Sequence, residues 1–212
     1  MLSVGNDIVD LKKPENMGKS RDICFIGRVF TEEERALISG STFPDKLLWA
    51  LWAAKEAAYK AVSRGNPAIC SIPRRYHVVL TMSETVGKAV RLVGKVITPR
   101  GEFALRIDAT QEMVHAVAAG FDSDLGRICW RVDRLNGTDD PAAFVRKNII
   151  RAIARCIGCP ADRLCVVKDA TGPGAPSVLL RGRLLTPWIS LSHDGFFTAF
   201  AFIPVFKVTA VR

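Results

Sequence analysis

The chain has 212 residues, of which 49% are hydrophobic and 24% charged, and its formal net charge is +9. This composition is ordinary for a globular protein with a filled core. No apolar run approaches the roughly 20 residues that a membrane-spanning helix needs, and the N-terminus lacks the features of a signal peptide. We therefore expect a cytoplasmic protein that does not enter a membrane.

The net charge of +9 suits several anionic partners. The basic residues are dispersed, without a Lys/Arg-rich run or the interleaved aromatic side chains of a nucleic-acid surface. This distribution argues against nucleic acid as the partner. The six cysteines are also scattered, and Cys156 and Cys159 form a single Cys-x-x-Cys with no second pair to complete a zinc site. A redox pair or buried thiols near a helix end both fit, and we expect all six to be reduced in a cytoplasmic protein.

The N-terminal part of the chain is predicted to begin with a strand and to continue with helices. Residues 2–11 read as a strand in which acidic residues are embedded. Thr31 followed by Glu34 is a capping box that opens a helix, and residues 46–63, rich in Ala, Leu, Lys and Glu, predict a long helix. Strands separated by Gly, Pro and Ser are expected next, at residues 76–82, 88–97, 102–109 and 113–121.

After a polar connector at residues 122–127, the pattern of strands and a helix starts again. The predicted elements of this second part are strands at 128–134 and 164–168, a helix at 141–157, a loop at 172–176, and strands at 188–192 and 196–206. Each part has a long helix and an antiparallel set of strands, which indicates an α+β fold with a pseudo-repeat.

The predicted helix at 46–63 places Glu56 and Lys60 on one face, together with Trp49, Trp52 and Ala53, because successive residues turn by about 100°. One interpretation is an exposed ion pair, which would contribute about 0.2–0.5 kcal/mol. The two tryptophans favour a buried face with a functional pair instead, since a helix that is apolar on most sides is usually buried.

Asp7 lies in the first predicted strand and points to the same side as Gly5 and Val9. A carboxylate among small and apolar neighbours must be paired, hydrogen-bonded or bound to a metal ion. A capping or turn aspartate is the alternative. Asp10 points to the opposite side and is the weaker candidate.

Two further groups could hold anions. Ser192 and His193 lie in a Ser-Leu-Ser-His-Asp-Gly segment without the Gly-x-Ser-x-Gly elbow of a catalytic serine. They suit phosphate binding, with a turn histidine as the alternative. Arg146 falls within the apolar arc of the helix at 141–157, so it needs an anion or must extend to solvent. The solvated stripe of the same helix consists of Lys147, Arg151 and Arg155.

Four short motifs resemble those of the 4′-phosphopantetheinyl transferase superfamily. The family's Gly-Ile-Asp-Ile is similar to residues 5–8 (Gly-Asn-Asp-Ile), and its Phe-Thr/Ser-x-x-Glu to residues 30–34. Its Trp-x-x-Lys-Glu-Ala-x-x-Lys is matched at residues 52–60, and its Ser-His element at Ser192 and His193. The chain departs from the family at Asn6, which replaces an apolar residue, and at Ala175, which replaces a cation.

The order of these motifs is that of the short holo-acyl-carrier-protein synthases, whereas the length of the chain resembles the surfactin-type transferases. The resemblance therefore implies a pseudo-dimer of two similar halves in exchanged order, each a long helix packed on an antiparallel sheet. Residues 1–124 would carry the Asp, Glu and Lys motifs. Residues 125–212 would carry the basic helix, the Gly-x-Pro loop and the Ser-His motif.

The resemblance also implies an activity: Mg²⁺-dependent transfer of phosphopantetheine from coenzyme A to a serine of an acidic acyl or peptidyl carrier protein, with release of 3′,5′-ADP. Asp7 and Glu56 would hold Mg²⁺, and the catalytic residues would be Glu56, Lys60 and Asp7. The cofactor contacts would be Ser192, His193, Lys60, Lys55 and Arg146. We expect Glu56 and His193 to meet across one cleft of a single chain. The alternatives are a non-catalytic basic protein that binds nucleic acid and a scaffold for carrier proteins.

Overall fold

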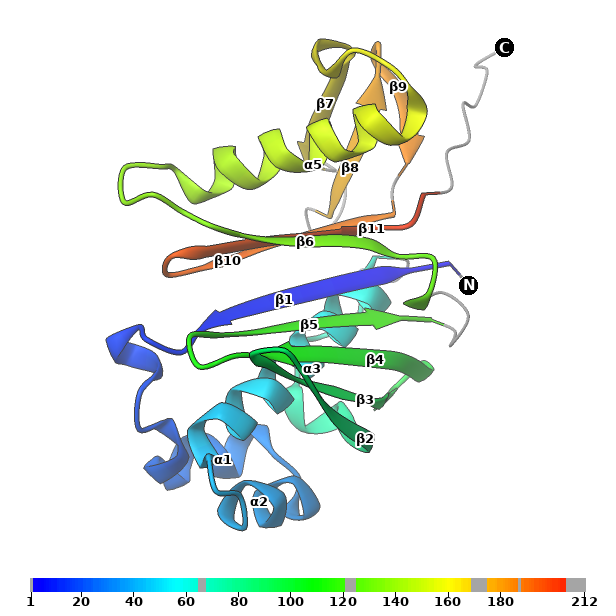
Figure 1. Ribbon diagram of the computed structural model, residues 1–212. Helices are drawn as coiled ribbons and strands as arrows, with labels where there is room; N and C mark the ends of the chain where they lie inside the picture. Colours follow the sequence, from blue (N-terminus) through cyan, green and yellow to red (C-terminus); the bar gives the residue numbers. More distant parts are fainter. Residues whose placement is uncertain (1, 65–67, 121–124, 169–174, 187, 205–212) are drawn as a thin grey trace.

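The computed structural model describes residues 2–64, 68–120, 125–168, 175–186 and 188–204, and has helices and antiparallel sheets arranged in two parts (Figure 1). Within these residues no helix is both long enough and apolar enough to cross a membrane. The α+β class predicted from the sequence is confirmed by this mixture of helices and antiparallel strands.

The first part contains a five-stranded antiparallel sheet in the order β1-β5-β4-β3-β2. Its strands are β1 (Val4–Asp10), β2 (His77–Val86), β3 (Ala89–Thr98), β4 (Gly101–Ala109) and β5 (Met113–Ala119). The long helix α3 (Pro44–Ser63) packs on this sheet and buries most of its alanines and leucines there. β1 is an edge strand of the sheet, so both of its faces and one free edge are available to other elements.

Short helices precede α3 and surround its N-terminal end. They are η1 (Pro14–Asn16), η2 (Lys19–Arg21), α1 (Ile23–Val29) and α2 (Glu32–Ser39), and a further 3₁₀ turn, η3 (Pro73–Arg75), follows α3. The predicted capping box is confirmed at the start of α2. The Glu34 N–H donates to Thr31 Oγ1 over 3.3 Å, and the Thr31 N–H donates to Glu34 Oε2 over 2.9 Å.

The close approach of β1 to α3 depends on small side chains. A Cβ atom on Gly5 would overlap the carbonyl oxygen of Ala57 and crowd the backbone nitrogen of Ala61. Because side chains alternate along a strand, Gly5, Asp7 and Val9 share the face of β1 that meets α3. This orientation of Asp7 is the one predicted from the sequence.

The second part has two three-stranded antiparallel sheets, in the orders β10-β11-β6 and β7-β8-β9. The strands are β6 (Cys129–Arg134), β7 (Leu164–Lys168), β8 (Pro176–Leu180), β9 (Arg183–Thr186), β10 (Ile189–Asp194) and β11 (Phe197–Phe202). Helix α5 (Pro141–Ile157) packs against strands of both sheets through an apolar face that includes Val145, Ile149 and Ile153. The short turn η4 (Ala161–Arg163) connects α5 to β7.

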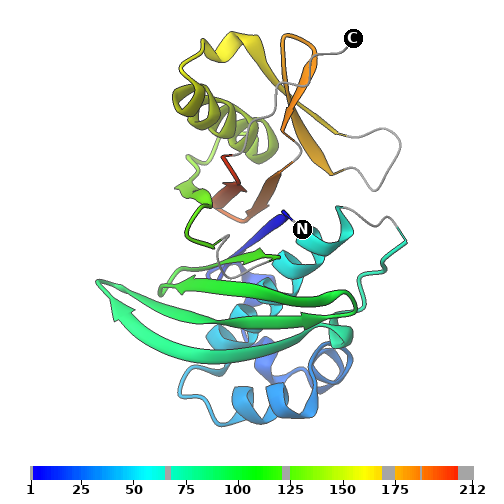
Figure 2. The same ribbon diagram turned by 90° about the vertical axis from the view of Figure 1, so that its right-hand side faces the viewer.

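The two parts meet where β1 and β5 pack against β10 and β11. Ile8 packs with Phe197 and Ala199, and Val4 lies in a second cluster with Ala201. Figure 2 shows this stacking from the side, with α5 and its strands above and the five-stranded sheet below. β1 therefore lies between α3 on one face and the second part on the other.

The structure agrees with several predicted elements and adds others. Helix 141–157 and strand 164–168 have the predicted bounds, whereas α1, β8 and β9 were not predicted. Most of the predicted loop at 172–176 lies outside the described residues. Each part has a long helix on antiparallel strands, but within the described residues five strands form one sheet in the first part and six form two sheets in the second. The division into halves 1–124 and 125–212 stays a prediction.

Candidate functional site

Helix α3 and strand β1 bring together the three residues that the sequence singled out. The Lys60 ammonium lies 2.7 Å from Asp7 Oδ1 and also donates to the carbonyl oxygen of Asn6 over 3.1 Å. Glu56 is one helical turn before Lys60 on the same face of α3, and accepts a long hydrogen bond of 3.5 Å from the Ser71 hydroxyl. Asp7, Glu56 and Lys60 thus form one partly buried cluster on the α3 side of β1.

Burial and nearby charges shape the protonation of the two carboxylates. Burial raises the pKa of Asp7, the Lys60 ammonium opposes this rise, and the charge of Asp194 adds to it. Burial also raises the pKa of Glu56, and the neighbouring charge of Asp7 raises it further. Each carboxylate is therefore easier to protonate than in water, as expected of buried carboxylates.

The carboxylate pair fits a divalent cation. Two nearby carboxylates offer the hard oxygen ligands that Mg²⁺ prefers, and a bound cation would stabilise the charged form of both buried groups. Among the described residues there is no group of three or more His, Cys, Asp or Glu side chains that could hold a metal ion. This is compatible with Mg²⁺, which usually takes one or two carboxylates and completes its shell with water and substrate phosphates.

The structure contradicts the prediction that Lys55 contacts a cofactor. Its side chain is only 1% exposed and its Nζ forms a 2.7 Å ion pair with Glu34, which is fully buried. The same ammonium donates to the carbonyl oxygens of Pro73 and Tyr76. The side chain of Lys55 therefore points into the core of the first part and joins α3 to α2.

The Ser-His pair is divided between two faces of β10. Ser192 is buried and its hydroxyl accepts a 2.9 Å hydrogen bond from Asn6 Nδ2, while Ser190 Oγ accepts one of 2.9 Å from the Asn6 N–H. The side chain of Ser192 is thus enclosed between the two parts, and its predicted contact with a cofactor phosphate stays a prediction. His193 points to the opposite face and is exposed. The predicted meeting of His193 with Glu56 stays a prediction.

Arg146 is half-buried on α5, as its place in the apolar arc suggested, and the described residues provide no ion-pair partner for it. A phosphate contact through Arg146 stays a prediction.

Sequence reasoning missed Arg64, the C-cap residue of α3, which continues the stripe of Glu56 and Lys60. The Arg64 guanidinium donates to the carbonyl oxygen of Pro176 over 2.9 Å and to that of Ile189. Burial lowers its pKa to about 10. Its spacing of four residues from Lys60 is the signal that could have identified it. Through these hydrogen bonds Arg64 links the C-terminal end of α3 to β8 and β10 of the second part.

Asp10 is the weaker candidate of the first strand, and the structure gives its carboxylate backbone partners. Asp10 Oδ1 accepts from the Lys12 N–H over 2.8 Å, and Oδ2 accepts from the Phe196 N–H over 2.9 Å. Gly195, in the turn between β10 and β11, has a φ of +51°, and a Cβ atom there would overlap Asp10. The carboxylate of Asp10 therefore holds the β10–β11 turn against β1, on the face opposite to Asp7.

Comparison with known proteins bears on the first part of the chain. The model of the 4′-phosphopantetheinyl transferase superfamily matches residues 3–116, a segment that contains Asp7, Glu56 and Lys60. A holo-[acyl-carrier-protein] synthase of a Bradyrhizobium species is 31% identical over 120 residues, covering 51% of this chain and 82% of the relative. A synthase of the same name from Mycoplasma pneumoniae is 33% identical over 70 residues, covering 32% of this chain and 59% of that protein.

Two solved structures are also similar. The holo-[acyl-carrier-protein] synthase of Neisseria meningitidis is 24% identical with a TM-score of 0.39, and covers 57% of this chain and 100% of its own. That of Thermotoga maritima is 15% identical with a TM-score of 0.39, and covers 72% of this chain and 92% of its own.

Proposed function

The chain belongs to the 4′-phosphopantetheinyl transferase superfamily and is a 4′-phosphopantetheinyl transferase, and we propose which substrates and residues carry its reaction. The proposed reaction moves the 4′-phosphopantetheine group of coenzyme A to a serine hydroxyl of an acyl or peptidyl carrier protein. The serine oxygen forms a bond to the pantetheine-side phosphorus, the bond from that phosphorus to the bridging oxygen breaks, and 3′,5′-ADP leaves. The observation that carries the proposal is the cluster of Asp7, Lys60 and Glu56 within the segment that matches the family.

Asp7 and Glu56 are the residues that would hold Mg²⁺. When bound, the cation would neutralise the pyrophosphate of coenzyme A and polarise the phosphorus that is attacked. Glu56 would also act as the general base that accepts the serine proton. The Lys60 ammonium, beside Asp7, is placed to offset negative charge that develops on the phosphoryl oxygens.

The second part would complete the cofactor site. We propose that it is a second, similar half in exchanged order, and that the nucleotide end of coenzyme A lies near the junction of the two parts, with His193 and Arg146 as phosphate contacts. Arg64 supports this arrangement, because it fixes the position of Pro176 and Ile189 relative to the helix that carries Glu56. An acidic carrier protein would complement the net charge of +9.

One assay tests the proposed function. The purified protein is incubated with coenzyme A, Mg²⁺ and a panel of apo acyl and peptidyl carrier proteins, and each carrier is examined by intact-mass spectrometry. We expect one carrier at least to gain the mass of a single phosphopantetheine group, and this gain to disappear in excess EDTA. No gain with any carrier would contradict the transfer, and full activity in EDTA would contradict the metal requirement.

A further inference from the structure

The positive charge of the protein is concentrated in the part that the family model does not match. Residues 125–212 contain 13 Lys and Arg against 6 Asp and Glu, a net charge of +7. Residues 1–124 contain 17 Lys and Arg against 15 Asp and Glu, a net charge of +2. Most of the net charge therefore lies outside the segment that contains Asp7, Glu56 and Lys60.

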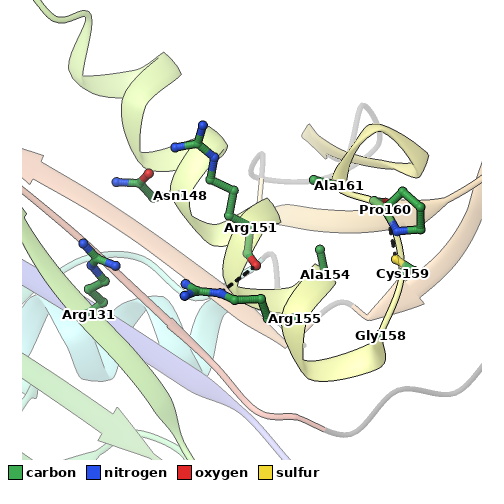
Figure 3. A pocket seen from close by; sticks show the side chains of 9 residues that line it. All are labelled: Arg131, Asn148, Arg151, Ala154, Arg155, Gly158, Cys159, Pro160 and Ala161. Carbon is green, nitrogen blue, oxygen red and sulfur yellow. Dashed lines mark hydrogen bonds between the residues drawn. The ribbon is translucent and has the colours of Figure 1, made fainter.

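A hollow with a volume of about 740 Å³ lies between the C-terminal half of α5 and the edge strand β6. Arg131 of β6 extends toward it from one side, and Asn148, Arg151 and Arg155 line it from the helix (Figure 3). Its remaining lining is small and largely apolar, provided by Ala154, Gly158, Cys159, Pro160 and Ala161. The hollow thus combines guanidinium groups with apolar surface.

The arginines of this hollow are only partly neutralised. Arg131 forms a 2.6 Å ion pair with Asp133, whose other carboxylate oxygen accepts from Asn148. Arg151 and Arg155 have no carboxylate within ion-pair distance in the part of the chain that the structure describes. Arg155 Nε donates instead to the carbonyl oxygen of Arg151 over 3.3 Å. Two exposed guanidinium groups are therefore available to an external acid.

A second hollow of about 480 Å³ adjoins the first, since Cys159 lines both. It contributes Arg163, Arg181 and Arg183, together with Leu180, Leu184 and Leu185. Leu184 is 46% exposed, so the apolar component reaches the surface. The N–H of Arg181 donates to the carbonyl oxygen of Arg163 over 2.9 Å, which joins the two segments that carry these arginines.

We propose that the two hollows form one docking surface for an acidic, amphipathic segment of a partner protein. This arginine surface consists of Arg131, Arg151, Arg155, Arg163, Arg181 and Arg183. Guanidinium groups bind carboxylates through paired hydrogen bonds, and the leucine, proline and alanine side chains between them provide contacts for the apolar face of the segment. A nucleic-acid backbone offers no such apolar face, and no aromatic side chain for base stacking lines either hollow among the described residues.

The stability of α5 alone does not account for this surface. A basic residue near the C-terminus of a helix is favourable because of the helix dipole, and Arg155 is in the last turn of α5. Arg163, Arg181 and Arg183 lie outside that helix, on η4, in the β8–β9 turn and on β9. Asp7, Glu56 and Lys60 line neither hollow, so this docking surface is separate from the proposed transferase site.

Binding of a synthetic peptide tests the proposal without any measurement of turnover. The probe is a fluorescein-labelled helical peptide with glutamates on one face and leucines on the other, measured by fluorescence anisotropy at moderate salt. We expect Arg151→Gln combined with Arg155→Gln to weaken its affinity about tenfold. The matched control combines Lys88→Gln with Lys147→Gln, which removes the same charge at exposed positions outside both hollows and should leave the affinity unchanged.

Three outcomes would overturn the proposal. The first is an equal loss in the arginine variant and the lysine control, which would mean that net charge alone attracts the peptide. The second is unchanged affinity when serines replace the leucines of the peptide, since the apolar contacts would then contribute nothing. The third is tighter binding of a single-stranded oligonucleotide of equal charge, which would identify a nucleic-acid surface. None of these results bears on phosphopantetheine transfer, so the proposed function is tested separately.

Discussion

The two faces of β1 use acidic residues for different purposes. On the face toward α3, Asp7 is paired with Lys60 and lies near the charge of Glu56, which leaves two carboxylates that favour a cation. On the opposite face, both carboxylate oxygens of Asp10 accept backbone N–H groups. The Asp10 carboxylate is satisfied by backbone N–H groups and stabilises the junction of the two parts. Asp7 and Glu56, whose negative charges lie near each other, are suited to binding a cation. Asp7 and Asp10, which lie in these two environments, are only three positions apart along one strand.

The largest expected effect is on the α3 face. Asp7→Asn or Glu56→Gln should each lower kcat/KM for carrier modification by about 10³-fold, because each removes a charge that a bound Mg²⁺ needs. The rates are measured by intact-mass spectrometry, with circular dichroism to confirm the fold. Glu15→Gln, which neutralises an exposed acid in η1, is the matched control and should retain full activity. Unimpaired turnover in both site variants would remove these two residues from the mechanism.

A smaller effect is expected on the opposite face of β1. In Asp10→Asn one backbone donor would face the amide NH₂ group, so we expect the free energy of unfolding to fall by about 1–3 kcal/mol. The Mg²⁺ concentration for half-maximal activity should not change. Denaturant titration and metal titration measure these quantities, and Asp162→Asn, at an exposed position, is the control. Unaltered stability with a much higher Mg²⁺ requirement would instead make Asp10 a metal ligand.

The smallest effect concerns pH and His115, which lies on β5 beside Asn6 at the junction of the two parts. Burial lowers the pKa of His115 from 6.5 to about 3. In the folded state His115 therefore stays neutral below pH 6.5, whereas in the unfolded state it binds a proton. Its contribution to the free energy of unfolding is complete above pH 6.5 and decreases as the pH is lowered.

From pH 7 to pH 5.5 this single group should reduce the free energy of unfolding by about 1 kcal/mol. His115→Gln should remove that part of the pH dependence, as measured by denaturant titrations at both pH values. A slope unchanged by His115→Gln would show that the imidazole does not titrate as described.

The sequence by itself determined the local structure and the direction of the main side chains of the site. Helical spacing placed Glu56 and Lys60 on one face, and strand alternation placed Asp7 on the side of Gly5, where the structure has both. The capping box at Thr31 and Glu34 was equally local. These predictions hold because the period of a helix or strand fixes which residues share a face, whatever the element packs against.

Only the tertiary structure decided which partner each face meets. Lys55 is adjacent to Glu56 in a charged motif, yet it turns into the core because a buried Glu34 from α2 lies opposite. Ser192 faces Asn6 and is enclosed, while its neighbour His193 remains exposed. Arg64 reaches two carbonyl groups more than 100 positions away in the chain. Periodicity specifies the direction of a side chain relative to its own element, and the identity of the opposing surface comes from packing between segments distant in sequence.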